Sequence, residues 1–164
     1  MSDQRVTNVL ERTRPALALA MAACAVAMVV AGFFAQSSRW TDFTDGQSMA
    51  WTDGIKPWAI WAAVGGLTVL ALLVLVSWND QWLIFGTAGL FVFWRAGTEA
   101  AAYRSQIESD AWATVYDPQE IAIGLKAVPI VGTVGAAIAA LLIVVTLATC
   151  FRLRASGGSP TLQS

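Results

Sequence analysis

Two charged side chains lie within an otherwise apolar stretch of the chain, and they are its strongest candidates for chemistry. Arg95 and Glu99 are four residues apart, so on a helix they share one face and can form an ion pair. Charges inside a membrane segment are costly and by default suggest a functional role. Two interpretations stay open, namely a structural or partner-docking ion pair, and a site for an ion, a proton or a substrate.

The sequence offers little other reactive chemistry. It contains no histidine, which excludes histidine-bound haem, histidine-containing zinc sites and histidine bases. Its two cysteines, Cys24 and Cys150, form no CxxC motif, which argues against a dithiol redox centre. The glycine-rich segments lie inside apolar runs rather than after strands, so they do not resemble phosphate-binding loops. We therefore predict a protein that is not an enzyme and that has no cofactor and no metal site.

The composition of the whole chain is apolar, with few charged residues. Of 164 residues, 57% are hydrophobic and 13% are charged, whereas soluble domains carry about 25% charged residues. The net charge of −1 leaves no basic excess for nucleic-acid binding. These values predict an integral membrane protein with no nucleic-acid partner.

Four apolar stretches have the length of about 20 residues that a helix needs to cross a bilayer. We predict spans at 16–35, 57–77, 82–103 and 127–151. The third is the least apolar because it contains Arg95 and Glu99, and a re-entrant or interfacial segment is its alternative. The first is longer than the apolar core of a signal peptide, so we expect it to be retained. The predicted fold class is all-α, an integral membrane four-helix antiparallel bundle.

The charges near the span ends predict the orientation. An even number of spans places both termini on one side of the membrane. Cytoplasmic loops carry an excess of Lys and Arg, and five basic residues lie on the side of the termini against four on the other. Those five are Arg5, Arg12, Arg14, Arg152 and Arg154. We expect a cytoplasmic N-terminal tail (1–15), a transmembrane domain (16–151) and a flexible cytoplasmic C-terminal tail (152–164) in a bacterial inner membrane.

Two outer loops, 36–56 and 104–126, are too long to be simple connectors. Thr-Asp-Gly sequences in the first favour turns over a calcium site, because the acid spacing does not fit an EF-hand. In the second, Asp117 and Pro118 resemble a helix cap and the first helical residue, so we predict a short interfacial helix there. Pro129 either kinks that helix into the last span or begins the span afresh. Without a disulfide, the loops are expected to pack on each other or on a neighbour.

Small residues and tryptophans suggest how the spans pack and where they meet water. Helices in lipid approach closely where small residues line one ridge. The predicted packing residues are Ala23, Ala27 and Ala31, with Ala35, on the first span and Gly132, Ala136 and Ala140 on the last. Tryptophans prefer the membrane–water interface. The predicted interface anchors are Trp40, Trp51, Trp58, Trp61, Trp78 and Trp82.

These features favour one functional class over another. The first hypothesis is a non-catalytic accessory subunit of a larger bacterial membrane complex, whose partners are other integral membrane subunits and membrane lipids. An Ala-rich composition with Arg in excess of Lys is typical of high-GC bacteria, for which a respiratory-chain assembly is one candidate host. The alternative is a small homo-oligomeric transporter or channel that uses the Arg95/Glu99 pair. Small exporters of that kind usually carry an acid deep in the first span, which this chain lacks.

Overall fold

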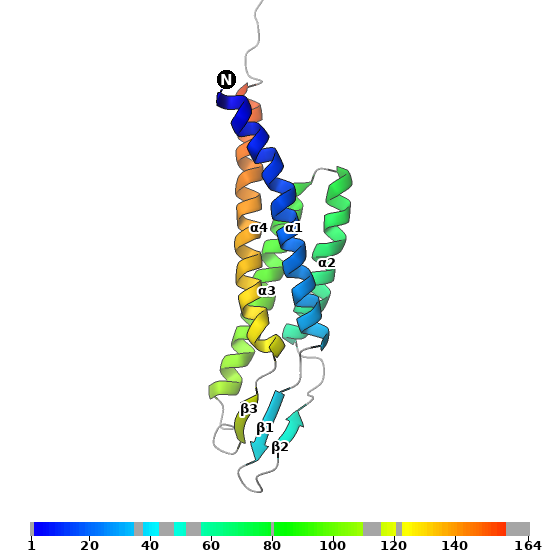
Figure 1. The fold of residues 1–164 in the computed structure, drawn as a ribbon, viewed down its shortest axis with the longest axis vertical. Helices are drawn as coiled ribbons and strands as arrows, with labels where there is room; N and C mark the ends of the chain where they lie inside the picture. The colour runs from blue at the N-terminus through cyan, green and yellow to red at the C-terminus, as the bar shows by residue number, and fades with distance from the viewer. Residues whose placement is uncertain are drawn as a thin grey trace, which may run out of the picture.

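The computed structural model describes residues 2–34, 38–42, 48–51, 57–79, 81–109, 116–120 and 123–156. These residues form the four helices α1 (Ser2–Phe34), α2 (Pro57–Asn79), α3 (Trp82–Ser109) and α4 (Ile123–Ser156). They also form the three short strands β1 (Ser38–Asp42), β2 (Ser48–Trp51) and β3 (Tyr116–Glu120). The helices lie side by side along the long axis of the molecule, and the strands lie beyond one end of them (Figure 1).

Three of the four helices are long and apolar enough to cross a membrane. Their apolar segments are Arg12–Phe34 in α1, Pro57–Val76 in α2 and Ile123–Arg152 in α4. The prediction of helices long and apolar enough to span a membrane is therefore confirmed for these three segments. Helix α3 does not meet the same criterion, because two charged residues, Arg95 and Glu99, follow its apolar first half.

The helices pack in a closed circuit around an apolar core. Helix α3 contacts α2 and α4, and α1 contacts the same two helices from the other side. The largest fully buried side chains include Met21 of α1, Phe85 and Phe93 of α3, and Leu142 of α4. Outward-facing positions carry Leu, Val, Ile and Phe side chains that are 39% to 83% exposed, as expected for surfaces that meet lipid rather than water.

Each of the four helices extends past at least one of its predicted span boundaries. Helix α1 begins at Ser2 and continues through Pro15, so part of the predicted N-terminal tail is helical and joined directly to the span. Helix α4 begins at Ile123 and contains Pro129. Pro129 therefore does not begin the span, as one of the two stated alternatives had it, but lies inside α4. Residues 157–164 of the predicted C-terminal tail lie outside the described residues.

The two long loops meet in a small antiparallel sheet. Its strand order is β2-β1-β3, and Thr41 of β1 pairs with Ser48 of β2 and with Asp117 of β3. Residues 38–42 of the first loop thus pair with residues 116–120 of the second. The Thr-Asp-Gly turns predicted at 44–46 and 52–54 lie outside the described residues.

The predicted short interfacial helix at Pro118 is wrong, because residues 116–120 form strand β3. Proline has no N–H to donate and is tolerated at sheet edges and bulges. Both conditions hold for Pro118, because β3 is an edge strand and its register against β1 shifts at a bulge between Arg39 and Trp40. The helix-capping signal is local, whereas the pairing that overrides it comes from residues more than 70 positions away.

Candidate functional site

Helix α3 brings the two predicted site residues into direct contact. Arg95 Nη2 lies 2.5 Å from Glu99 Oε1, as the four-residue spacing on a helix allows. The Arg95 side chain is 43% exposed and the Glu99 side chain 28% exposed. The pair therefore lies on the outer surface of the helical bundle and not in its interior.

Two aromatic side chains complete this surface. The guanidinium carbon of Arg95 lies 5.9 Å from the ring centroid of Trp61 on α2, within the range of a cation–π contact. The Trp61 ring meets Phe91 edge-on at a centroid distance of 5.8 Å and an interplanar angle of 78°. We call Trp61, Phe91, Arg95 and Glu99 the outward patch.

The position of Trp61 places the outward patch near one end of the bundle. Trp61 is four residues after Pro57, where the apolar segment of α2 begins, which is about 6 Å along the helix. Arg95 lies at the level of Trp61, and Glu99 is one turn closer to the end that carries the strands. The charges are therefore close to one boundary of the apolar region, with the cation on the deeper side.

The opposite face of the same α3 segment is closed against α4. A Cβ atom added to Gly132 of α4 would lie 2.7 Å from the carbonyl oxygen of Phe93 and 2.9 Å from Cα of Gly97. Ala96 and Ala100 are fully buried. At this level α3 therefore packs directly against α4 on the side opposite the ion pair, which is consistent with the outward direction of the pair.

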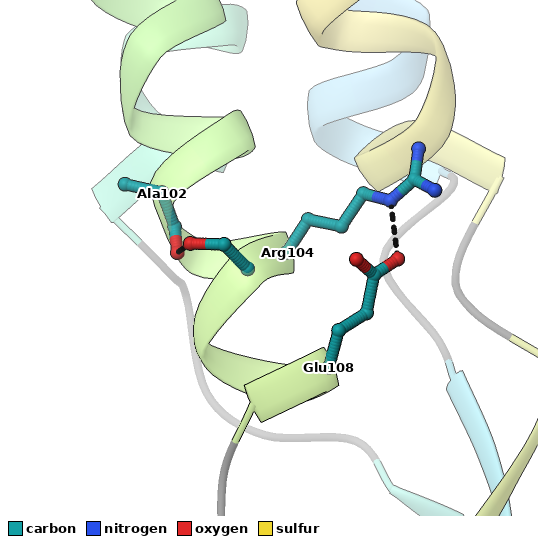
Figure 2. A network of polar contacts seen from close by, with 4 residues as sticks. Ala102, Arg104 and Glu108 are labelled. Atoms are coloured by element: carbon teal, nitrogen blue, oxygen red, sulfur yellow. Dashed lines mark hydrogen bonds and ion pairs between the residues drawn. The ribbon is translucent and has the colours of Figure 1, made fainter.

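A second ion pair of the same composition follows on α3. Arg104 Nε donates to Glu108 Oε1 at 2.8 Å, and the two side chains are 43% and 47% exposed. Figure 2 shows this pair on the last turns of α3, with Arg104 reaching towards Glu108. Counted along α3 from Arg95, Arg104 lies about 8 Å beyond the level of the first residue of α2.

Two positions of the small-residue ridge predicted on α1 do not pack against the other helices of this chain. Ala23 and Ala27 are exposed and only Ala31 is buried, while Ala35 lies outside the described residues. The contacting face consists instead of Met21, Ala25, Met28 and Gly32. Long Met side chains can fill an irregular interior, so the presence of alanines alone does not indicate which face packs.

The packing ridge of α4 is displaced by a smaller amount. Gly132 is buried as predicted, but Ala136 and Ala140 are only partly buried. The buried row continues through Gly135 and Ala139, each one position before a predicted alanine. A Cβ added to Gly135 would lie 2.6 Å from the Phe93 ring, so a large aromatic side chain determines which glycines are needed.

The tryptophans divide into three groups. Trp58 was predicted to be an interface anchor, but it is only 2% exposed and lies in the core. Its indole nitrogen has no hydrogen-bond partner among the described residues. Trp61 and Trp82 are partly exposed. The side chains of Trp40, Trp51 and Trp78 lie outside what the structure describes.

Sequence reasoning did not identify two of the residues that shape the site. Phe91 lies one turn before Arg95, so the spacing Phe91-Arg95-Glu99 could have indicated a continuous ridge. Gly97, between the two charges, was not chosen as a packing residue although it contacts α4. Within the described residues, no group of three His, Cys, Asp or Glu side chains could hold a metal ion.

Comparisons with protein-family models, with characterised proteins and with solved structures find no match to this chain.

Proposed function

We propose that this chain is a non-catalytic, four-span accessory subunit of a larger complex in a bacterial inner membrane. The first support concerns α3 as the fourth span. Residues 82–99 of α3 pack along α2 and α4 and reach the level at which α2 begins. This stretch of 18 residues corresponds to about 27 Å of helix, which is close to the thickness of a bilayer core. The four spans would then run antiparallel, with both termini cytoplasmic.

The observation that carries the non-catalytic, non-conducting part of the proposal is the direction of the ion pair. Ionisable residues that form a transport path face a bundle interior or a water-filled cavity. Arg95 and Glu99 face outwards, and the α3–α4 contact behind them is closed by Gly97 and Gly132. Among the described residues, the buried polar side chains are Thr146 and Thr149, whose hydroxyls donate to helix carbonyls of α4.

Two further features favour assembly with other membrane subunits. Helix α1 presents Ala23 and Ala27 on its outer face, and small residues four apart allow another helix to approach closely. Beyond the helices, the three-stranded sheet joins the two long loops into one unit, which could contact a partner outside the membrane. The Ala-rich composition is typical of high-GC bacteria, for which a respiratory-chain assembly is one candidate host.

A second candidate function is a homo-oligomeric transporter or channel. The feature that favours it is the same outward pair, because copies arranged around an axis could direct Arg95 and Glu99 towards a shared path. In that case the ion path would form only between subunits. Glu99→Gln should then abolish transport while the oligomer remains assembled.

The proposed assembly can be tested by purifying the tagged full chain from its native membrane in mild detergent. We expect co-migration with a larger complex, and we expect Ala27→Leu to weaken that association because the added side chain separates the helices. Ala71→Leu, at an exposed alanine of α2, is the matched control. A self-assembled oligomer without other proteins would contradict the accessory role.

The four-span topology needs its own test. Single cysteines at Ser2 and Ser156, introduced after Cys24→Ser and Cys150→Ser, can be probed with a reagent that does not cross membranes. Both ends should react only after the cells are permeabilised. Reaction of one end in intact cells and of the other only after permeabilisation would contradict an even number of spans.

A further inference from the structure

We infer that the outward patch binds a zwitterionic phospholipid whose headgroup ends in a primary amine, as in phosphatidylethanolamine. The inference rests on the proposed membrane embedding, and it concerns a lipid contact that is separate from assembly with other subunits. It is carried by the order of the two charges along the membrane normal, by their unused hydrogen-bonding capacity and by the aromatic side chains beside them.

The order of charges in the patch is complementary to that of the headgroup. Arg95 lies at the level of Trp61, and Glu99 lies one turn closer to the end of the apolar region. In phosphatidylethanolamine, the phosphate is attached on the side of the acyl chains and the ammonium group is at the far end. The lipid phosphate would therefore meet Arg95 and the lipid ammonium would meet Glu99. This match is independent of which membrane leaflet the patch faces.

The existing ion pair leaves enough donors and acceptors for the lipid. A guanidinium has five N–H groups and a carboxylate has two acceptor oxygens, and the described contact joins one nitrogen, Nη2, to one oxygen, Oε1. The side chains are 43% and 28% exposed, so a headgroup can reach the remaining atoms. Binding would extend the pair into a four-charge arrangement without breaking it.

The aromatic side chains provide a surface for the apolar part of the lipid. Phe91 is 52% exposed and lies one turn deeper than Arg95 on the same helix. Trp61 is partly exposed and contacts both Phe91 and Arg95. Aromatic rings at this depth pack well against the glycerol region and upper acyl chains, so the patch presents apolar, cationic and anionic groups in the order that the lipid requires.

The same chemistry predicts which lipids bind less well. Phosphatidylglycerol has the phosphate but no ammonium group, so Glu99 would face uncompensated negative charge. Phosphatidylcholine has a quaternary ammonium group that cannot donate a hydrogen bond to the carboxylate. The expected order of affinity therefore begins with phosphatidylethanolamine and places both other lipids below it.

The test is native mass spectrometry of the purified full chain in detergent with equal amounts of the three lipids. We expect phosphatidylethanolamine to be retained about fivefold more than phosphatidylglycerol, the ratio produced by one exposed ion pair at the upper end of its usual strength. It should also be retained more than phosphatidylcholine, which keeps the positive charge but cannot donate a hydrogen bond to Glu99. Equal retention of all three lipids by the unmodified chain would overturn the inference.

A charge-swapped variant separates charge order from the mere presence of charge. Arg95→Glu combined with Glu99→Arg keeps an ion pair at the same spacing but places the anion on the deeper side, so the preference should disappear. The matched control is Arg104→Glu combined with Glu108→Arg, which should keep the preference because that pair lies beyond the level at which α2 begins and away from Trp61 and Phe91. A swapped 95/99 variant that still prefers phosphatidylethanolamine would overturn the inference.

A protein occupant of the patch would give a different result. If the swapped 95/99 variant loses a co-purifying membrane protein while its lipid preference stays intact, a partner helix and not a lipid occupies the patch, and the inference is wrong. Melting curves of both swapped variants check that each remains folded. Failure of the proposed four-span topology would be recognised separately, by the cysteine labelling.

Discussion

Helix α3 carries the same pair of side chains twice, and the comparison of the two pairs shows what depth adds to an ion pair. Arg95–Glu99 and Arg104–Glu108 both join residues four apart, and both arginines are 43% exposed. The first pair lies beside Trp61 within the apolar segments, whereas the second lies beyond the level at which α2 begins. Since the two pairs share their residue types and spacing, differences in their energetics should come mainly from their surroundings, which in the proposed topology are lipid for the first pair and water for the second.

The largest expected effect comes from the contact that holds the first pair at its depth. Gly132→Ala should lower the free energy of unfolding by about 1–3 kcal/mol, the usual cost of overpacking, because the new Cβ meets backbone atoms of Phe93 and Gly97. Gly97→Ala should stay within about 1 kcal/mol of the unmodified chain, since its Cβ would meet atoms only at 3.5 Å or more. Unfolding in detergent measures both. Equal stabilities would show that α3 does not rest on α4 at this level.

The next effect compares the two ion pairs directly. Double-mutant cycles with Arg→Gln and Glu→Gln substitutions should give a coupling of about 1–2 kcal/mol for Arg95–Glu99, because attraction between charges grows as the local dielectric falls. Arg104–Glu108 should give about 0.5 kcal/mol or less, as exposed pairs do. The cycles should be measured in bicelles so that the lipid boundary is present. Equal couplings would show that the depth of the first pair does not strengthen its attraction.

A smaller effect isolates the aromatic neighbour. A cycle of Trp61→Leu and Arg95→Gln should give a coupling of about 0.5–1 kcal/mol, the usual strength of a cation–π contact at a partly exposed site. Trp82→Leu with Arg95→Gln is the control and should give none, because Trp82 is the first residue of α3 and lies about 20 Å along the helix from Arg95. A coupling as large for Trp82 would mean that the cycle reports general loss of packing and not the ring contact.

The smallest effect is the response to salt. Raising the ionic strength to about 1 M shortens the screening length to ~3 Å, so the coupling of Arg104–Glu108 should vanish. The coupling of Arg95–Glu99 should fall by less than half, because ions have poor access to a site beside lipid. Repeating both cycles at low and high salt measures the difference. Identical salt dependence would place both pairs in water.

Local rules succeeded wherever the outcome depends on neighbours within a helical turn. The Arg95–Glu99 contact follows from spacing alone, and three spans follow from the length of uncharged runs. The same rules failed for Pro118, where strand pairing with residues 39–42 overrides a helix-start pattern. They also failed for Ala23, Ala27 and Trp58, because residue type does not reveal which side of a helix its neighbours will cover.

The sequence by itself determined that the chain is helical and apolar, that its reactive chemistry is sparse, and that one Arg–Glu pair would form within a largely apolar helix. These results depend on composition and on short spacings, which the backbone geometry of a helix converts directly into contacts. Only the tertiary structure decided that this pair faces outwards beside Trp61, that Gly97 and Gly132 close the interior behind it, and that the two long loops join in one sheet. Those outcomes require segments far apart in the chain to meet, so they depend on how side chains of different helices fit together.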